Sequence, residues 1–275
     1  MSVSPLIQEY MTRRVIYAYP ESSILDVRNL MVRHRISRIV IVKDRRPIGI
    51  ITQRDLLRFA SENPNIDVGE ARAVEAMSKK LITAKPVDTV GYAARLMINN
   101  NVSSIVIVDS NEELNGIITK FDLCICCINK LAGFSNVREY MTPNPVTVKP
   151  TLNIFEVINI MSSRRIGRVI VVEDGKPIGI ITLSDLVSVI PEFLSIRVEF
   201  KRKIRELKIP RLELLIASDV MTLNPITIHE DEDISEASRL MVKHNISGLP
   251  VINGELLRGV ITKTDITRAI ANTMA

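Results

Sequence analysis

Several residue types are scarce in this 275-residue chain, and each scarcity argues against a class of protein. There is no tryptophan and only 4% of the residues are aromatic, which disfavours a nucleic-acid-binding module. No uninterrupted run of about 18 apolar residues exists, so the sequence predicts no membrane span. Its N-terminus lacks the layout of a signal peptide, and we expect a cytoplasmic protein.

Histidines and cysteines are also few, with three of each. The cysteines are Cys124, Cys126 and Cys127, a spacing that fits neither a zinc site nor a disulfide framework. We interpret them as small apolar residues that pack one face of a helix. No serine–histidine–aspartate arrangement and no reactive-cysteine setting is visible, so we expect no metal site and no enzymatic activity.

What the chain does contain is one heptad written four times: glycine, two β-branched residues, threonine, two variable residues and aspartate. The copies occupy residues 49–55, 116–122, 179–185 and 259–265. Such recurrence indicates an internal repeat. The threonine and aspartate have the spacing of a helix capping box, and a threonine beside free helix N–H groups also suits an anion. Both interpretations stay open on the residues alone.

Each repeat begins with methionine followed by serine or threonine, at residues 11–12, 77–78, 141–142 and 221–222. Short strands are predicted at 15–17, 81–84, 146–148 and 226–228. Residues that favour helix N-caps follow, namely Ser23, Thr89, Asn153 and Asp233. A helix, a β-rich run, the heptad strand and a second helix complete the repeat.

Together these features resemble the CBS (cystathionine β-synthase) motif. The resemblance implies an α/β (α+β) fold in which four β-α-β-β-α motifs form two Bateman modules packed into a disc. Module 1 is expected at residues 1–132, with motifs at 7–60 and 73–130. Module 2 is expected at 133–275, with motifs at 137–190 and 217–273 joined by a basic linker at 191–216. The arrangement is similar to archaeal stand-alone CBS proteins and to the γ subunit of AMP-activated protein kinase.

The resemblance further implies adenine-nucleotide sites in the clefts between paired motifs. We expect the phosphates to bind at Thr52, Thr119, Thr182, Thr262, Ser37, Arg38, Arg168, Lys120 and Lys263. The ribose hydroxyls are expected at Asp55, Asp122, Asp185 and Asp265. The adenine pocket is expected among Ile16, Ala18, Ile36, Ile82, Ala84, Val102, Val146, Val148, Ile166, Ile226, Ile228 and Ile246.

One repeat position differs between copies in a regular way. It holds Arg38, Ser104, Arg168 and Gly248, so each half of the chain has one arginine and one small residue there. The forked guanidinium suits phosphate, although a solvent-facing arginine at a strand start is the alternative. His34 and His244 share another position, at the end of the first helix, where a cation complements the helix dipole.

We therefore interpret the chain as a regulatory protein that binds AMP, ADP or ATP as a regulatory ligand and needs no catalytic cofactor. We expect it to act on an unidentified regulated protein, as a monomeric disc or as a homodimer of discs. Two alternatives stay open. One is a CBS sensor of S-adenosylmethionine. The other is a nucleic-acid-binding protein that uses the basic linker, since a net charge of +5 permits the binding of anions from nucleotides to nucleic acid.

Overall fold

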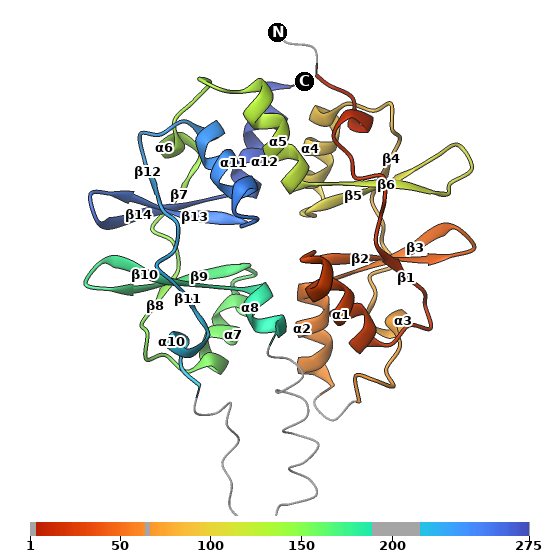
Figure 1. Ribbon diagram of the computed structural model, residues 1–275, viewed down its shortest axis with the longest axis horizontal. Helices are drawn as coiled ribbons and strands as arrows, with labels where there is room; N and C mark the ends of the chain where they lie inside the picture. Colours follow the sequence, from red (N-terminus) through yellow and green to blue (C-terminus); the bar gives the residue numbers. More distant parts are fainter. Residues whose placement is uncertain (1–3, 64–66, 189–214, 275) are drawn as a thin grey trace, which may run out of the picture.

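The computed structural model describes residues 4–63, 67–188 and 215–274, which form a disc of four similar motifs (Figure 1). The basic linker predicted at 191–216 lies outside the described residues except for its last two. Among the described residues, no helix is long and apolar enough to cross a membrane.

Each motif contains a short first strand, a helix, a two-stranded hairpin and a second helix. Motif 1 consists of β1 (Tyr17–Ala18), α1 (Ile24–His34), β2 (Arg38–Lys43), β3 (Arg46–Thr52) and α2 (Gln53–Glu62). Motif 2 consists of β4 (Thr83–Ala84), α4 (Val90–Asn99), β5 (Ser104–Val108), β6 (Leu114–Thr119) and α5 (Lys120–Lys130).

The second half of the chain repeats this order. Motif 3 consists of β8 (Thr147–Val148), α7 (Ile154–Ser163), β9 (Arg168–Glu173), β10 (Lys176–Thr182) and α8 (Leu183–Ser188). Motif 4 consists of β12 (Ile228–His229), α11 (Ile234–Lys243), β13 (Gly248–Asn253), β14 (Leu256–Thr262) and α12 (Lys263–Thr273). The first strand of each motif pairs in parallel with the second, which pairs antiparallel with the third. All four first strands begin one or two residues later than predicted, because only these later residues reach the parallel partner.

The helix caps predicted from the sequence are present. In α1, α4, α7 and α11, the side chain of Ser23, Thr89, Asn153 or Asp233 accepts a backbone N–H from the first turn. Such a bond satisfies one of the donors that a helix leaves open at its start. The first helix of every repeat therefore begins where the sequence indicates.

The segment that leads into each motif packs on the other motif of its module. These leading segments (residues 5–12, 71–78, 135–142 and 215–222) contain the short helices η1 (Ile7–Glu9), α3 (Ala73–Ala76), α6 (Val137–Tyr140) and α10 (Ala217–Val220). In module 2 they also add β7 (Thr142–Pro143) to β14 and β11 (Thr222–Leu223) to β10. In module 1, Thr12 pairs with Ile117 and Ser78 with Ile50. The two motifs of a module therefore exchange their leading segments.

This exchange explains the glycine of the heptad. The methionine that opens each repeat packs over the heptad glycine of the partner motif, in the pairs Met11–Gly116, Met77–Gly49, Met141–Gly259 and Met221–Gly179. An added Cβ at Gly116 would lie 3.0 Å from the Met11 sulfur, and one at Gly179 would lie 2.8 Å from Met221 Cγ. Both distances are tighter than ordinary packing, so a larger residue would displace the partner segment.

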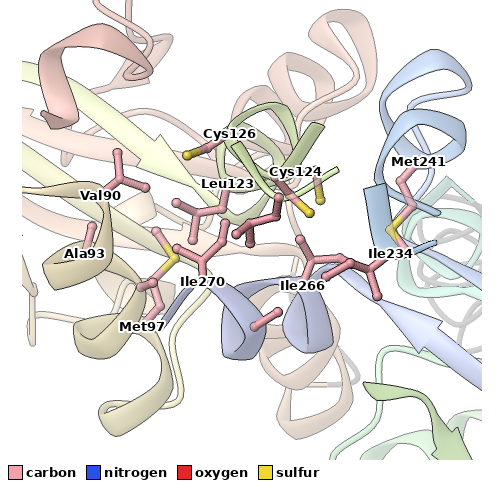
Figure 2. Packing of buried hydrophobic residues seen from close by; sticks show 14 of the residues in the cluster. Val90, Ala93, Met97, Leu123, Cys124, Cys126, Ile234, Met241, Ile266 and Ile270 are labelled. Atoms are coloured by element: carbon pink, nitrogen blue, oxygen red, sulfur yellow. The ribbon is translucent and has the colours of Figure 1, made fainter. Parts of the chain in front are cut away.

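Two different seams join the modules. At one end of the disc, α4 and α5 pack against α11 and α12, and residues such as Met97, Leu123, Ile234 and Ile270 form one continuous apolar core (Figure 2). At the other end α2 packs against α8, where Gln53 Nε2 donates to Ser184 Oγ at 3.0 Å. In module 1 the sheets pack face to face, as shown by the cluster of β2 and β5 valines, and in module 2 β10 contacts β14.

Candidate ligand-binding site

The heptad threonine and aspartate form a capping interaction in all four copies. The aspartate Oδ2 accepts both the threonine N–H and the threonine hydroxyl, with distances between 2.6 and 2.9 Å. The helix-capping interpretation is therefore realised at every heptad. Because the threonine hydroxyl already donates to its own aspartate, a phosphate would have to share or replace that bond.

A cavity of about 570 Å³ lies where the four motifs meet, and we call it the central cavity. Motif 1 contributes much of the wall, and motifs 2, 3 and 4 contribute the rest. The lining residues are Thr12, Arg14, Val15, Ile16, His34, Arg35, Ile36, Ser37, Arg38, Val40, Ser103, Ile117, Thr119, Lys120, Phe121, Asp122, Arg168, Asn245, Ser247, Lys263 and Thr264. Its volume is in the range of sites that enclose a small molecule.

Four inner cations give this cavity its charge: Arg38, Lys120, Arg168 and Lys263, one from each motif. We call them the cation quartet. Arg38 donates from Nη1 to the Ser103 carbonyl and from Nη2 to Ser37 Oγ, both at 2.6 Å. Arg168 donates from Nη2 to Ser247 Oγ at 2.8 Å. Each arginine therefore lies across the junction of its own module.

The two lysines begin helices that face each other across the seam. Lys120 opens α5 and donates to Thr264 Oγ1 at 3.0 Å, and Lys263 opens α12 and lies 4.5 Å from the centre of the Phe121 ring. A cation at a helix N-terminus is unfavourable in itself, since that end of the dipole is positive. Two lysines and two helix N-termini at one point together form a strongly anion-attracting region.

Burial lowers the pKa of all four cations, and repulsion from the other cations adds to this effect at the two lysines. Burial, aided by the charge of Arg38, lowers the pKa of Lys120 to about 8. Burial likewise lowers the pKa of Lys263 to about 8 and that of both Arg38 and Arg168 to about 10. Partly buried cations with depressed pKa values are typical of a functional site, because an anionic ligand would relieve the cost.

Asp122 is the acid that faces this cation quartet in the cavity wall. Only 6% of its surface is exposed, and burial raises its pKa against the opposing effects of Thr119 and Arg38. Beside it, Ile16, Ile36 and Val40 form an apolar part of the wall. The cavity thus combines an apolar slot, one carboxylate and a basic end, a combination that fits an amphiphilic anion.

The central cavity unites part of the predicted site. Among the predicted phosphate residues it contains Thr119, Ser37 and the whole cation quartet, together with Asp122 for the ribose and Ile16 and Ile36 for the adenine. The predicted residues that do not line it are Thr52, Thr182, Thr262, Asp55, Asp185, Asp265, Ala18, Ile82, Ala84, Val102, Val146, Val148, Ile166, Ile226, Ile228 and Ile246. The roles assigned to these residues stay predictions. Ala18, Ala84, Val148 and Ile228 are core residues with at most 7% of their surface exposed.

Sequence reasoning missed several cavity residues. Arg14 and Arg35 are exposed lining residues that belong to no repeated motif signature, and Phe121 occupies a variable heptad position. His34 was interpreted as a helix C-terminal cation, and it also lines the cavity. The sequence shows that Arg14 and Arg35 are charged, but it could not predict that this part of motif 1 lies at the centre of the disc.

The cysteines pack as predicted. All three are fully buried on α5 within the seam core, and burial raises the pKa of Cys124 to about 12 and of Cys126 and Cys127 to about 11. Figure 2 shows Cys124 and Cys126 among apolar side chains. In the described part of the chain, no group of three histidine, cysteine, aspartate or glutamate residues could hold a metal ion.

Comparison with known proteins decides the family. The family model described as the CBS domain matches residues 7–62, 68–126, 137–192 and 217–272. The chain belongs to the CBS domain family. The prediction of an α/β fold with four CBS motifs in two Bateman modules is thereby confirmed, while the predicted module and motif boundaries stay predictions.

Several similar proteins with known sequences or structures are archaeal. An uncharacterized protein of Methanocaldococcus jannaschii, MJ1404, is 27% identical over 97% of this chain, which spans only 62% of that relative's length. MJ1225 of the same organism is 23% identical over 94% of this chain and 96% of its own length. Its crystal structure, described as that of a candidate archaeal homologue of γ-AMPK, superposes with a TM-score of 0.84 at 21% identity, covering 97% of this chain and 100% of that one. A crystal structure from Pyrococcus horikoshii has a TM-score of 0.65 at 19% identity, with coverages of 96% and 99%. These structural matches show the fold.

Proposed function

We propose that this CBS protein is a regulatory protein that binds an adenine nucleotide in the central cavity. The observation that carries the proposal is the cation quartet, in which every motif contributes one cation to the same enclosed space. The nucleoside would lie against Ile16, Ile36 and Asp122, with its phosphates toward Arg38, Lys120, Arg168 and Lys263. A nearby carboxylate suits the vicinal hydroxyls of ribose, and arginine and lysine suit phosphate.

Regulation would follow from the position of the cavity between the modules. A ligand whose phosphates contact both modules changes the balance between arrangements of the disc only if it binds one arrangement more tightly. AMP, ADP and ATP differ in charge and length, and therefore in how many of the four cations they neutralise. Coupling free energies of this kind are typically about 1–3 kcal/mol. We propose that the protein transmits the nucleotide ratio to a regulated protein in this way.

The charge of the cavity disfavours S-adenosylmethionine, the alternative ligand of the same fold. Its sulfonium and ammonium groups would lie beside four partly buried cations, and like charges at short range raise the free energy of binding. Adenine nucleotides carry the opposite charge. S-adenosylmethionine therefore serves as the comparison ligand in the test.

Isothermal titration calorimetry with AMP, ADP, ATP and S-adenosylmethionine tests the proposal. Asp122→Ala should weaken nucleotide binding at least tenfold, because it removes the carboxylate of the cavity wall. Asp185→Ala removes the same kind of helix cap outside the cavity and should leave the affinity within about twofold. The two variants share the stability loss of a missing cap, about 0.5–2 kcal/mol, so that effect cancels in the comparison.

Three outcomes would contradict the proposal. An absence of heat from every adenine nucleotide would reject nucleotide binding. Equal loss of affinity in both aspartate variants would place the ligand elsewhere than in the central cavity. Tighter binding of S-adenosylmethionine than of any nucleotide would replace the proposed ligand by the alternative one.

A further inference from the structure

The two arginines of the cation quartet are not equivalent, although they occupy the same repeat position. Arg38 is held at both ends of its guanidinium, by the Ser103 carbonyl and by Ser37 Oγ, each at 2.6 Å. Arg168 has a bond from Nη2 to Ser247 Oγ, while its Nε is buried and has no hydrogen-bond partner among the described residues. Buried donors without partners are rare, so this one calls for a physical reason.

The space that Arg168 occupies depends on Gly248. A Cβ built at Gly248 would overlap Arg168 Nη1, and would lie 2.9 Å from Arg168 Cζ and 2.8 Å from the Ile261 carbonyl oxygen. The guanidinium of Arg168 thus lies directly over the backbone where β13 begins. In module 1 the equivalent position is Ser104, a buried residue with a side chain, and Arg38 donates to the carbonyl of its neighbour Ser103, the residue equivalent to Ser247.

The pairing of motifs explains why this position alternates between arginine and a small residue. Within a module, the starts of the two equivalent strands meet at the junction of the motifs, so the arginine of one motif lies over the small residue of the other. Two arginines there would compete for the same space and repel each other. Glycine permits the closest approach of a planar group to the chain.

We propose that Gly248 is a positioning residue that directs Arg168 into the central cavity, and that Arg168 is the arginine that binds the ligand's anionic group while Arg38 is fixed in the wall. This inference rests on the proposed function, since it concerns how the same cavity holds an anion. Arg168 lines the cavity, and among the described residues its guanidinium donates one side-chain hydrogen bond, whereas that of Arg38 donates two hydrogen bonds. Arg38 already uses both terminal nitrogens on protein oxygens.

The test measures the affinity of the full chain for ATP and for inorganic tripolyphosphate. Gly248→Ala should weaken both by about tenfold, the worth of one charge-assisted hydrogen bond. Ser104→Ala at the matched position of module 1 should leave both within about twofold. In an Arg168→Ala background, Gly248→Ala should cause no further loss, because its effect passes through the guanidinium.

A second variant covers the case in which Gly248→Ala does not fold, as judged by thermal unfolding. Ser247→Ala removes the hydroxyl that accepts from Arg168 without adding an atom, and it should weaken tripolyphosphate binding only when Arg168 is present. Unchanged affinity in the glycine or serine variant, or a loss that persists in the Arg168→Ala background, would overturn the inference. If the wild type binds tripolyphosphate but not ATP, the nucleotide proposal fails and the positioning inference is still decided by tripolyphosphate. If it binds neither, both are rejected.

Discussion

At the scale of single residues, the strongest feature is a set of like charges brought together without a matching set of acids in the cavity wall. We expect the pH dependence of this cavity to come mainly from Lys120 and Lys263, because burial lowers the pKa of both lysines to about 8. A bound anion favours their charged forms. The protonation of these two lysines and the binding of an anion are therefore linked.

We expect nucleotide affinity to fall between pH 7.5 and pH 9, by up to about tenfold for each lysine, since one pKa unit corresponds to a factor of ten. Calorimetry with ATP at the two pH values checks this. A Lys120→Arg, Lys263→Arg double variant is the control, because arginine stays charged across the range. An equally steep pH dependence in that variant would show that the lysines are not its cause.

The lowered pKa values of the two lysines have the opposite effect on the stability of the ligand-free protein, which increases as the pH rises. Because both folded-state pKa values lie below the ordinary value of 10.5, the unfolded chain binds more protons between about pH 8 and 10.5. The contribution of these lysines to the unfolding free energy therefore rises with pH in that window. Ligand stabilisation and intrinsic stability change in opposite directions, which separates the two in melting experiments.

The repeat pattern predicted which four cations are important, but it could not predict that all four lie in one cavity. Arg38 and Arg168 were recognisable because they alternate with Ser104 and Gly248. In module 2 the arginine of one motif lies over the small residue of the other motif. This arrangement depends on contacts between residues far apart in the sequence, such as Arg168 and Ser247, which are 79 positions apart. The spacing of residues within one repeat does not predict contacts between motifs. For the same reason it did not predict that Arg14 and Arg35 line the cavity.

At the scale of elements, the heptad has two separable parts. Its threonine and aspartate cap a helix, and its glycine accepts the methionine of the partner's leading segment. The spacing alone indicated the cap as one of two interpretations of the threonine and aspartate. The role of the glycine could not be predicted, because the methionine that requires it belongs to a different motif.

We expect Gly179→Ala to lower the unfolding free energy by about 1–3 kcal/mol, as overpacking of a tight site usually does. The added methyl group would lie 2.8 Å from Met221 Cγ and 3.1 Å from Met221 Cβ. Gly116→Ala should cost less, because there the nearest atom is the Met11 sulfur at 3.0 Å. Chemical denaturation of both variants measures the difference.

A double-variant cycle identifies the cause. If the cost of Gly179→Ala arises from the partner methionine, it should shrink in a Met221→Ala background, where the added methyl group finds space. An undiminished cost would instead indicate strain within β10 itself.

At the scale of the whole molecule, the two seams between modules differ in kind. The seam of motifs 2 and 4 is a continuous apolar core, whereas the described part of the seam of motifs 1 and 3 includes polar bonds, from Gln53 to Ser184 and from Arg54 to the Arg165 carbonyl. Apolar burial contributes far more free energy than exposed hydrogen bonds do. The first seam therefore holds the modules together more strongly.

Substitutions in the two seams should differ accordingly. Ile270→Ala removes a fully buried side chain between helices and should lower the unfolding free energy by about 2–5 kcal/mol. Gln53→Ala should lower it by less than about 1 kcal/mol, since its bond is exposed. Thermal or denaturant unfolding compares them. Similar costs would mean that the seam of motifs 1 and 3 carries stability that its polar bonds do not explain.

The exchanged leading segments set the order in which a growing chain can mature on the ribosome. Thr12 is synthesised more than a hundred residues before its partner Ile117. Until Gly116 has also been made, the opening methionine Met11 has no glycine to cover. Each half of the protein must therefore finish in one step. A gene that encoded one motif alone would produce chains that complete each other only by trading these segments between molecules.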